Sequence, residues 1–217
     1  MLVERSTHPG WLSNAFLVAD EEGGTAVYVD TGAPLEPLQA AAERWGARPR
    51  LVLRTHDHPD HVEHESELGL EVATGSVEAG GLRVQAVPTP GHSADHVAFV
   101  INGEAVFTGD VLMRDTVGGG DFEDVRRSIM DVLMALPHEL RLHGGHGDDS
   151  TIGREWEENP FVRVWRAVEK EGTERCSVAG REATLVVWSP DYDGKGKAWV
   201  RFDDGRDAIV GGSRISR

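Results

Sequence analysis

The stretch Thr55-His56-Asp57-His58-Pro59-Asp60-His61 decides how the chain is interpreted. It follows the apolar run Leu51-Val52-Leu53, which predicts a short buried strand. Four ligand-type side chains occupy six consecutive positions, namely His56, His58, Asp60 and His61. Imidazole nitrogens and a carboxylate oxygen suit zinc, iron or manganese. The sequence therefore predicts a metal site at this strand end, and for this stretch alone a solvated histidine-rich turn is the alternative.

Three further segments place a ligand-type residue beside glycine. They are Thr89-Pro90-Gly91-His92, Thr108-Gly109-Asp110 and Gly144-Gly145-His146-Gly147. The first two follow predicted strands and the third follows a short apolar segment. Such residues, at the ends of buried strands, favour one shared metal site over a solvated turn.

The remaining chain alternates strand and helix patterns, which is typical of an α/β protein. Strand patterns cover residues 14–19, 25–29, 51–53, 97–101 and 104–108, with more strand-like sequence from Gly69 to Val87 around a Gly80-Gly81 turn. Helix patterns run from Leu35 to Trp45 and from Phe122 to Leu136, and a last helix is expected from Asn159-Pro160 to near Gly172.

Composition excludes several classes of partner. The 217 residues carry a formal net charge of −15, divided into −16 for residues 1–172 and +1 for residues 173–217. An acidic surface repels phosphate backbones and anionic lipids, so we expect no nucleic-acid and no membrane partner. The single cysteine, Cys176, cannot form an internal disulfide, and we expect neither a signal peptide nor a membrane span. A cytoplasmic protein is expected.

The four ligand segments together resemble the metallo-β-lactamase fold superfamily. The resemblance rests on HxHxDH at His56 to His61, TPGH at His92, TGD at Asp110 and GHG at His146, and covers roughly residues 10 to 165. The stretch Ser150 to Glu155, followed by Asn159-Pro160-Phe161, looks most like the glyoxalase II (hydroxyacylglutathione hydrolase) branch. The resemblance implies an αβ/βα four-layer sandwich with the metal site at one edge.

The resemblance also implies the role of each ligand. It puts His56, His58 and His92 on a first metal and Asp60, His61 and His146 on a second, with Asp110 bridging the two. Two divalent ions are expected, zinc first, with iron or manganese as alternatives. Asp60 and Asp110 are the catalytic carboxylates, acting with a metal-bound hydroxide. Two further side chains resemble supporting positions: Asp30 as a structural acid near the metal loop, and His96 either as a support for the ligands or in simple packing.

The chain also departs from the family pattern. Val62-Glu63-His64-Glu65 follows the metal loop where glycines are usual, and only 31 positions separate His61 from His92, so we expect a trimmed pocket wall. We expect no counterpart of the helical C-terminal domain of glyoxalase II in residues 173–217. We divide the chain into a metal hydrolase domain, residues 1–172, and a small antiparallel β extension, residues 173–217.

Short strand patterns in the extension cover residues 184–188, 198–202 and 208–210. The extension is interpreted as a structural cap or as a dimerisation element through which the chain would form a homo-oligomer. Its aromatic residues Trp188, Tyr192 and Trp199 fit either a binding face or a small core.

The function expected is hydrolysis of a thioester or related small acyl compound by a bridging hydroxide in a dinuclear metal site. Two alternatives stay open. One is a mononuclear Fe(II) oxidoreductase resembling persulfide dioxygenases, with His56, His58 and Asp110 or His92 around the iron. The other is a non-catalytic binding protein that keeps metal for structure. No serine or cysteine nucleophile is needed for the first function.

Overall fold

The first sheet of this computed structural model, which describes residues 1–217, has five strands in the order β1-β2-β3-β4-β5. Its strands are β1 (Leu2–Thr7), β2 (Asn14–Ala19), β3 (Thr25–Val29), β4 (Arg48–Leu53) and β5 (Glu71–Ala73). The first three strands are antiparallel, and β4 and β5 add in parallel. The predicted hairpin and the strand before the metal loop are confirmed. Strand β1 was not predicted because, as an edge strand with mostly half-buried side chains, it lacks a clear alternation.

Helix α1 (Glu36–Trp45) covers the outer face of this sheet. Its buried residues, among them Leu38 and Ala41, pack in one cluster with Leu17 and Tyr28 of the sheet. The helix ends at Gly46, whose φ of 62° is left-handed and accessible at low cost to glycine. Two single-turn helices come after β4: α2 (Pro59–Val62), which carries Asp60 and His61 of the metal loop, and α3 (Glu65–Leu68).

The second sheet has six strands in the order β13-β12-β9-β8-β7-β6. They are β6 (Val77–Ala79), β7 (Leu82–Pro88), β8 (Val97–Ile101), β9 (Ala105–Gly109), β12 (Arg141–Gly144) and β13 (Ser150–Thr151), with β10 (Leu112–Met113) and β11 (Thr116–Val117) forming a separate pair. Residues of the two sheets, such as Phe16 and Leu53 of the first and Phe99 and Phe107 of the second, share one buried cluster. The two sheets therefore lie face to face.

Three helices cover the other side of the second sheet: α4 (Phe122–Arg127), α5 (Ile152–Glu158) and α6 (Pro160–Trp165). The helix predicted to reach Leu136 is irregular, because α4 gives way to a π-helical turn, Ser128–Val132, and then to a 3-10 turn. The expectation that the last helix reaches Gly172 is wrong. Beyond Trp165 the side chains offer no apolar face, and Val168 is exposed. None of the helices is both long enough and apolar enough to cross a membrane.

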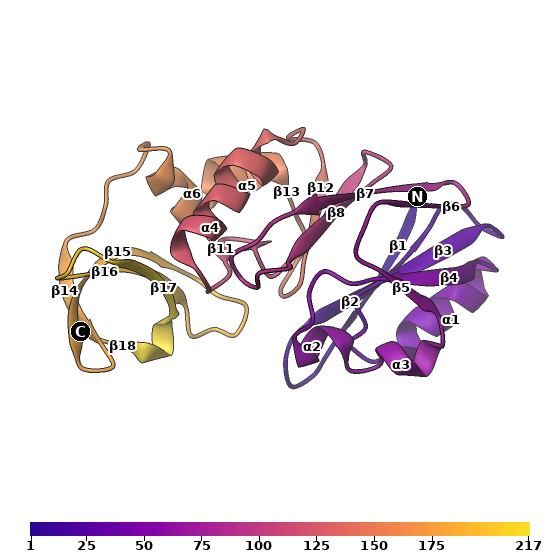
Figure 1. Ribbon diagram of the computed structural model, residues 1–217, viewed down its shortest axis with the longest axis horizontal. Helices are drawn as coiled ribbons and strands as arrows, with labels where there is room; N and C mark the ends of the chain where they lie inside the picture. Colours follow the sequence, from indigo (N-terminus) through magenta and orange to yellow (C-terminus); the bar gives the residue numbers. More distant parts are fainter.

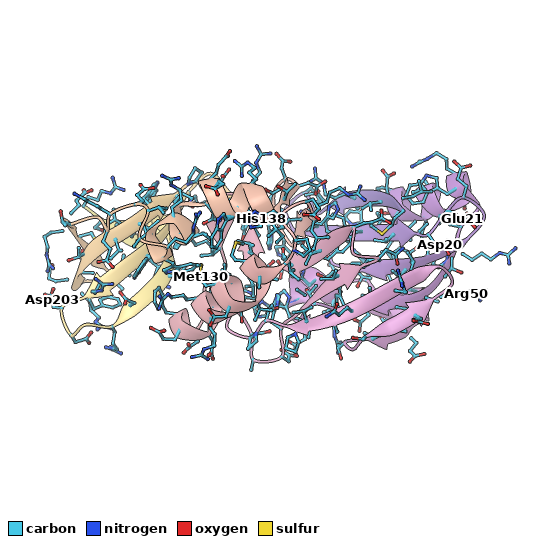
Figure 2. The ribbon with its side chains drawn as sticks, turned by 90° about the horizontal axis from the view of Figure 1, so that it is seen from above. Asp20, Glu21, Arg50, Met130, His138 and Asp203 are labelled. Atoms are coloured by element: carbon cyan, nitrogen blue, oxygen red, sulfur yellow. The ribbon has the colours of Figure 1, made fainter.

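The layer order is helix, sheet, sheet, helix, which is the predicted αβ/βα sandwich. Figure 1 shows α1 with β1–β5 toward one end of the elongated molecule and α4 to α6 between the second sheet and the C-terminal strands. Figure 2 shows the same length from above, with Asp203 at the end opposite Asp20 and Arg50, and with Met130 between them.

The C-terminal sheet is antiparallel, with its five strands in the order β17-β16-β15-β14-β18. They are β14 (Glu174–Val178), β15 (Arg181–Ser189), β16 (Lys197–Phe202), β17 (Asp207–Gly211) and β18 (Ile215–Ser216). The three predicted strands are confirmed and are longer than expected. Trp199 and Ile209 join the core that lies under the helices, and the Trp199 ring centre lies 5.0 Å from that of Phe122. The extension thus packs on the helical layer.

Candidate metal centre

The metal loop is held against the end of β3. Thr31 N donates to the His61 carbonyl oxygen at 2.8 Å, and His64 N donates to the Thr31 carbonyl oxygen at 3.1 Å. The backbones approach so closely that a Cβ at Gly32 would collide with the Asp60 carbonyl group. Pro59 begins α2 directly after His58, so the turn of the loop and the start of the helix coincide. These contacts fix the loop that carries four of the candidate ligands.

Three imidazoles converge in what we call the three-histidine half of the site. His58 Nδ1 lies 3.1 Å from His56 Nε2 and 2.9 Å from His92 Nε2. The His92 Nδ1–H donates to the Gly119 carbonyl oxygen at 2.9 Å, so the neutral ring carries its lone pair on Nε2. That lone pair points at the other two histidines, which is the arrangement a shared cation stabilises.

A second group, which we call the carboxylate half, contains Asp60, His61 and His146. Asp60 Oδ2 lies 3.4 Å from His146 Nε2 and 3.7 Å from His61 Nε2. His146 follows β12, and its loop is held by Asn14, whose side-chain amide donates to the carbonyl oxygens of Gly144 and Gly147. A ligand from the second sheet thus meets two ligands from the metal loop.

Asp110 lies between the two halves. Its Oδ1 is 3.2 Å from His61 Nε2, and its Oδ2 is 3.3 Å from His146 Nε2 and 3.6 Å from His92 Nε2. A Cβ at Gly145 would collide with Asp110 Oδ1, so glycine is needed beside this carboxylate. The structure therefore brings all seven predicted ligands into one cluster, with one carboxylate facing both halves.

Charge divides the two halves. Burial, reinforced by the charge of His61, lowers the pKa of His56 to about 4. Burial also lowers the pKa of His92. At His146 burial acts in the same direction, but Asp110 and Asp60 outweigh it and raise the pKa to about 9. The pKa of His61 is raised well above its usual value because Asp110 and Asp30 outweigh its burial.

The two carboxylates of the centre are correspondingly acidic. Burial alone would raise the pKa of Asp110, but His61 and His146 hold it well below its usual value. The pKa of Asp60 is also lowered, since its hydrogen bond to His146 and the charge of His61 outweigh its burial. Both groups are therefore negative at neutral pH and require cations beside them.

Asp30 orients one histidine of the carboxylate half. Its Oδ2 accepts a hydrogen bond from His61 Nδ1–H at 2.9 Å, which directs His61 Nε2 at Asp110. The same carboxylate accepts from Thr55 N and Thr55 Oγ1, both at 2.8 Å. Asp30 has a left-handed φ of 54°, a conformation that aspartate tolerates better than most residues.

His96 lies behind the centre and contacts a ligand. Its Nε2 accepts from the Asp110 backbone N–H at 3.2 Å, so the neutral ring carries its proton on Nδ1, 2.9 Å from Thr89 Oγ1. Burial, followed by the charge of His56, lowers its pKa well below the usual value. Of the two interpretations offered above, support for a ligand fits these contacts better than simple packing.

The donor set fits divalent metal ions. His61 Nε2 and Asp110 Oδ1 are buried without a hydrogen-bond partner, and each faces the other at a distance that a cation would bridge. Three imidazoles on one side and two carboxylates with two imidazoles on the other match the ligands preferred by zinc, iron or manganese.

Other histidines lie outside this cluster. His143 is buried, bonds Asp149 through Nδ1 at 2.9 Å and stacks on Phe107. His64 pairs with Glu67 on the surface of α3. Neither belongs to the groups of side chains that could share a metal ion.

Sequence reasoning missed three functional contacts. Thr55, directly before the motif, lies 3.0 Å from His56 Nδ1 through its hydroxyl and also bonds Asp30. The Gly119 carbonyl orients His92, and a backbone oxygen leaves no trace in a sequence. Tyr192 of the C-terminal extension stacks on His146, with ring centres 4.1 Å apart and planes at 12°. Only its position in space, far along the chain from any motif, reveals this contact.

No protein-family model matches the chain. Two of its curated relatives are named as hydroxyacylglutathione hydrolases. Hydroxyacylglutathione hydrolase GloC of Haemophilus influenzae is 27% identical over 197 residues, covering 69% of this chain and 92% of the relative. Hydroxyacylglutathione hydrolase of Rhodopseudomonas palustris is 35% identical over 159 residues, covering 60% of this chain and 61% of the relative.

Solved structures share the fold. A B3 metallo-β-lactamase, BLEG-1, gives a TM-score of 0.67 at 23% identity, covering 74% of this chain and 99% of its own. ETHE1 from Myxococcus xanthus gives a TM-score of 0.65 at 25% identity, covering 76% of this chain and 85% of the ETHE1 chain. TTHA1623, solved in a di-iron-bound form, gives a TM-score of 0.60 at 31% identity, covering 72% of this chain and 98% of the TTHA1623 chain. With the four-layer sandwich and the cluster of histidines and aspartates at its edge, the chain belongs to the metallo-β-lactamase superfamily.

Proposed function

We propose that this protein is a dinuclear metal hydrolase that cleaves a thioester or a related small acyl compound. One observation carries the proposal: the buried Asp110 carboxylate faces His92 of one half and His61 and His146 of the other within 3.2 to 3.6 Å. A carboxylate shared in this way suits two cations better than one.

Two divalent metals at such a site supply a hydroxide nucleophile and polarise the carbonyl group of the substrate. The residues of the chain then have separate tasks. Asp110 and the five histidines hold and orient the cations, and Asp30 fixes His61. Asp60, a further candidate ligand, is the more exposed carboxylate, with a side chain 24% accessible against 10% for Asp110, so it lies nearer to solvent and to an approaching substrate.

Covalent catalysis by cysteine does not compete with this mechanism. The only cysteine, Cys176, is buried in the small core of the C-terminal sheet, and burial raises the pKa of its thiol. Hydrolysis adds water across the acyl–sulfur bond and yields a carboxylic acid and a thiol. A thiol has a pKa of about 8.5 and leaves as thiolate without a strong general acid, which favours thioesters over amides.

Further support comes from two relatives that are named as hydroxyacylglutathione hydrolases. An acyl thioester of glutathione is therefore the first substrate to try. Zinc is the metal we propose first, and the di-iron form of TTHA1623 supports including iron.

A mononuclear Fe(II) oxidoreductase resembling persulfide dioxygenases is the second candidate. Asp110 Oδ2 lies within 3.6 Å of His92 Nε2, and His56 lies beside His92, so two histidines and one carboxylate could hold a single iron. The likeness to ETHE1 from Myxococcus xanthus fits this alternative.

Metal analysis of protein purified without added metal, combined with a panel of thioesters and lactones, separates the candidates. We expect two metal equivalents and release of free thiol from a glutathione thioester. Asp60→Asn should lower turnover strongly, while Asp57→Asn is the matched control, because Asp57 is an exposed neighbour outside the cluster. One equivalent of iron with oxygen uptake on a persulfide, and no thiol release, would replace the proposal by the second candidate.

A further inference from the structure

We propose that Tyr192 of the C-terminal extension is a positioning residue of the metal centre: its ring fixes the plane of His146 and borders the cleft beside that histidine. The inference deepens the proposed function, because it concerns the same centre. It gives the extension a part in the site, although the extension contributes no ligand.

His146 differs from the other histidines whose Nε2 faces the centre. The Nδ1 atoms of His56, His61 and His92 lie within hydrogen-bond distance of Thr55, Asp30 and Gly119 respectively. His146 Nδ1 is buried and has no such partner. An imidazole that lacks this hydrogen bond needs another contact to hold its orientation.

Tyr192 supplies that contact. The two rings are nearly parallel, with a 12° angle between planes and 4.1 Å between centres, which is a stacked arrangement. Beside His146, the Tyr192 Cβ would be 3.4 Å from a Cβ placed on Gly147, so the loop and the tyrosine are in close contact. The stacked ring therefore restricts rotation of His146 while its Nε2 faces Asp60 and Asp110.

The segment that carries Tyr192 is anchored at both ends. Asp191 Oδ2 and Lys197 Nζ form an ion pair at 3.1 Å, with side chains only 4% and 14% accessible. Asp191 Oδ1 also accepts from the Tyr192 backbone N–H at 3.0 Å, and Ser189 Oγ donates to the Asp115 carbonyl oxygen at 2.8 Å. Figure 1 shows the connection between β15 and β16 reaching from the C-terminal sheet toward the middle of the molecule. Since Trp199 and Ile209 are part of the core under the helices, the sheet that carries this segment packs against the rest of the molecule.

Tyr192 also borders the space next to the carboxylate half. A cleft of about 330 Å³ has Tyr192 and His146 on one side and Met113, Arg114 and Asp148 among its other lining residues. A smaller cleft of about 160 Å³ lies on the far side of Gly147 and is lined by Tyr192, Arg5 and Leu12. Tyr192 thus borders both clefts, including the one that His146 lines.

The test uses the full-length protein loaded with zinc, and follows release of each metal equivalent to a chelator. We expect Tyr192→Ala to release one of two equivalents at least about tenfold faster than wild type, the effect typical for loss of a group that orients a ligand. Tyr192→Phe keeps the ring and is the matched control, with release within about twofold of wild type. Melting temperatures of both variants verify that the fold persists, since Tyr192 is partly exposed.

A second readout needs neither metal nor substrate. In the metal-free protein the ring current of residue 192 should shift the His146 ring-proton resonances upfield in wild type and Tyr192→Phe, and this shift should vanish in Tyr192→Ala.

The positioning role is overturned if Tyr192→Ala releases metal at the wild-type rate, or if Tyr192→Phe releases it as fast as Tyr192→Ala. A wild type that binds one equivalent contradicts the dinuclear proposal instead, and the resonances of the metal-free protein then decide the role of Tyr192 separately.

Discussion

The three-histidine half and the carboxylate half of the metal centre lie side by side but differ in which cation they attract. In the first, burial lowers the pKa of His56 to about 4, so its imidazole is neutral at pH 7. In the second, Asp110 and Asp60 overcome burial and raise the pKa of His146 to about 9, so its imidazole is protonated when no metal is present. Two histidine side chains thus have different pKa values because their neighbours differ.

The difference teaches that protons compete with metal most strongly in the carboxylate half. Charged Asp60 and Asp110 require positive charge, which the protonated His61 and His146 provide until a metal replaces the protons. In the three-histidine half, burial lowers the pKa of His56 and His92, so a metal displaces fewer protons there. We therefore expect metal to fill the three-histidine half first at neutral pH, and the carboxylate half to bind less tightly as pH falls.

The largest expected effect is on metal stoichiometry. His61→Ala and His146→Ala each remove a ligand from the carboxylate half, so we expect one metal equivalent to be lost and the other to remain. Metal analysis after gel filtration measures this, with Asp57→Ala as the control outside the cluster. Wild-type stoichiometry in both histidine variants would remove the distinction between the halves.

A smaller effect is expected from Asp30→Asn. The amide cannot serve as the anionic acceptor that orients His61, so metal affinity of the carboxylate half should fall by about 10- to 100-fold while the three-histidine half changes little. Competition with a chromogenic chelator gives both affinities. An equal loss in both halves would mean that Asp30 acts by supporting the whole loop through Thr55.

The smallest effect concerns stability of the metal-free protein against pH. The pKa of His146 is raised on folding, so its contribution is complete below about pH 6.5 and is lost as pH rises through about 9. The pKa of His56 is lowered, so its contribution is present above about 6.5 and is lost as pH falls toward 4. Each change should move the melting temperature by a few degrees, since 1 kcal/mol corresponds to about 2–4 °C at this size.

Melting scans of metal-free His146→Gln and His56→Gln test these signs. The first substitution should flatten the alkaline slope and the second the acidic slope. If the two variants show the reverse assignment, the charge difference between the halves is wrong.

Much of the site could be predicted because its ligands come from short local segments. Four predicted ligands lie in one loop after β4. The other three follow strand patterns and have a glycine beside them, so short local motifs identify all seven. The αβ/βα sandwich followed from the same segments through their resemblance to a family. The break of the predicted helix after Arg127 could not be predicted, because the apolar spacing continues unchanged through the π-helical turn.

Contacts between distant segments were beyond prediction. Tyr192 reaches His146 only because the core around Trp199 fixes the C-terminal sheet against the helices, and no local pattern encodes that placement. The pKa difference between His56 and His146 likewise depends on distances to Asp60 and Asp110 that only the folded chain defines.

Calorimetric titration of the metal-free protein with zinc at pH 7, repeated in two buffers of different ionisation enthalpy, tests the dinuclear centre most directly. We predict two binding events: a first, tighter one with little proton release, and a second that releases about two protons, from His61 and His146. A single event with one metal per chain, or two events with equal proton release, would contradict the account of two electrostatically distinct halves sharing Asp110.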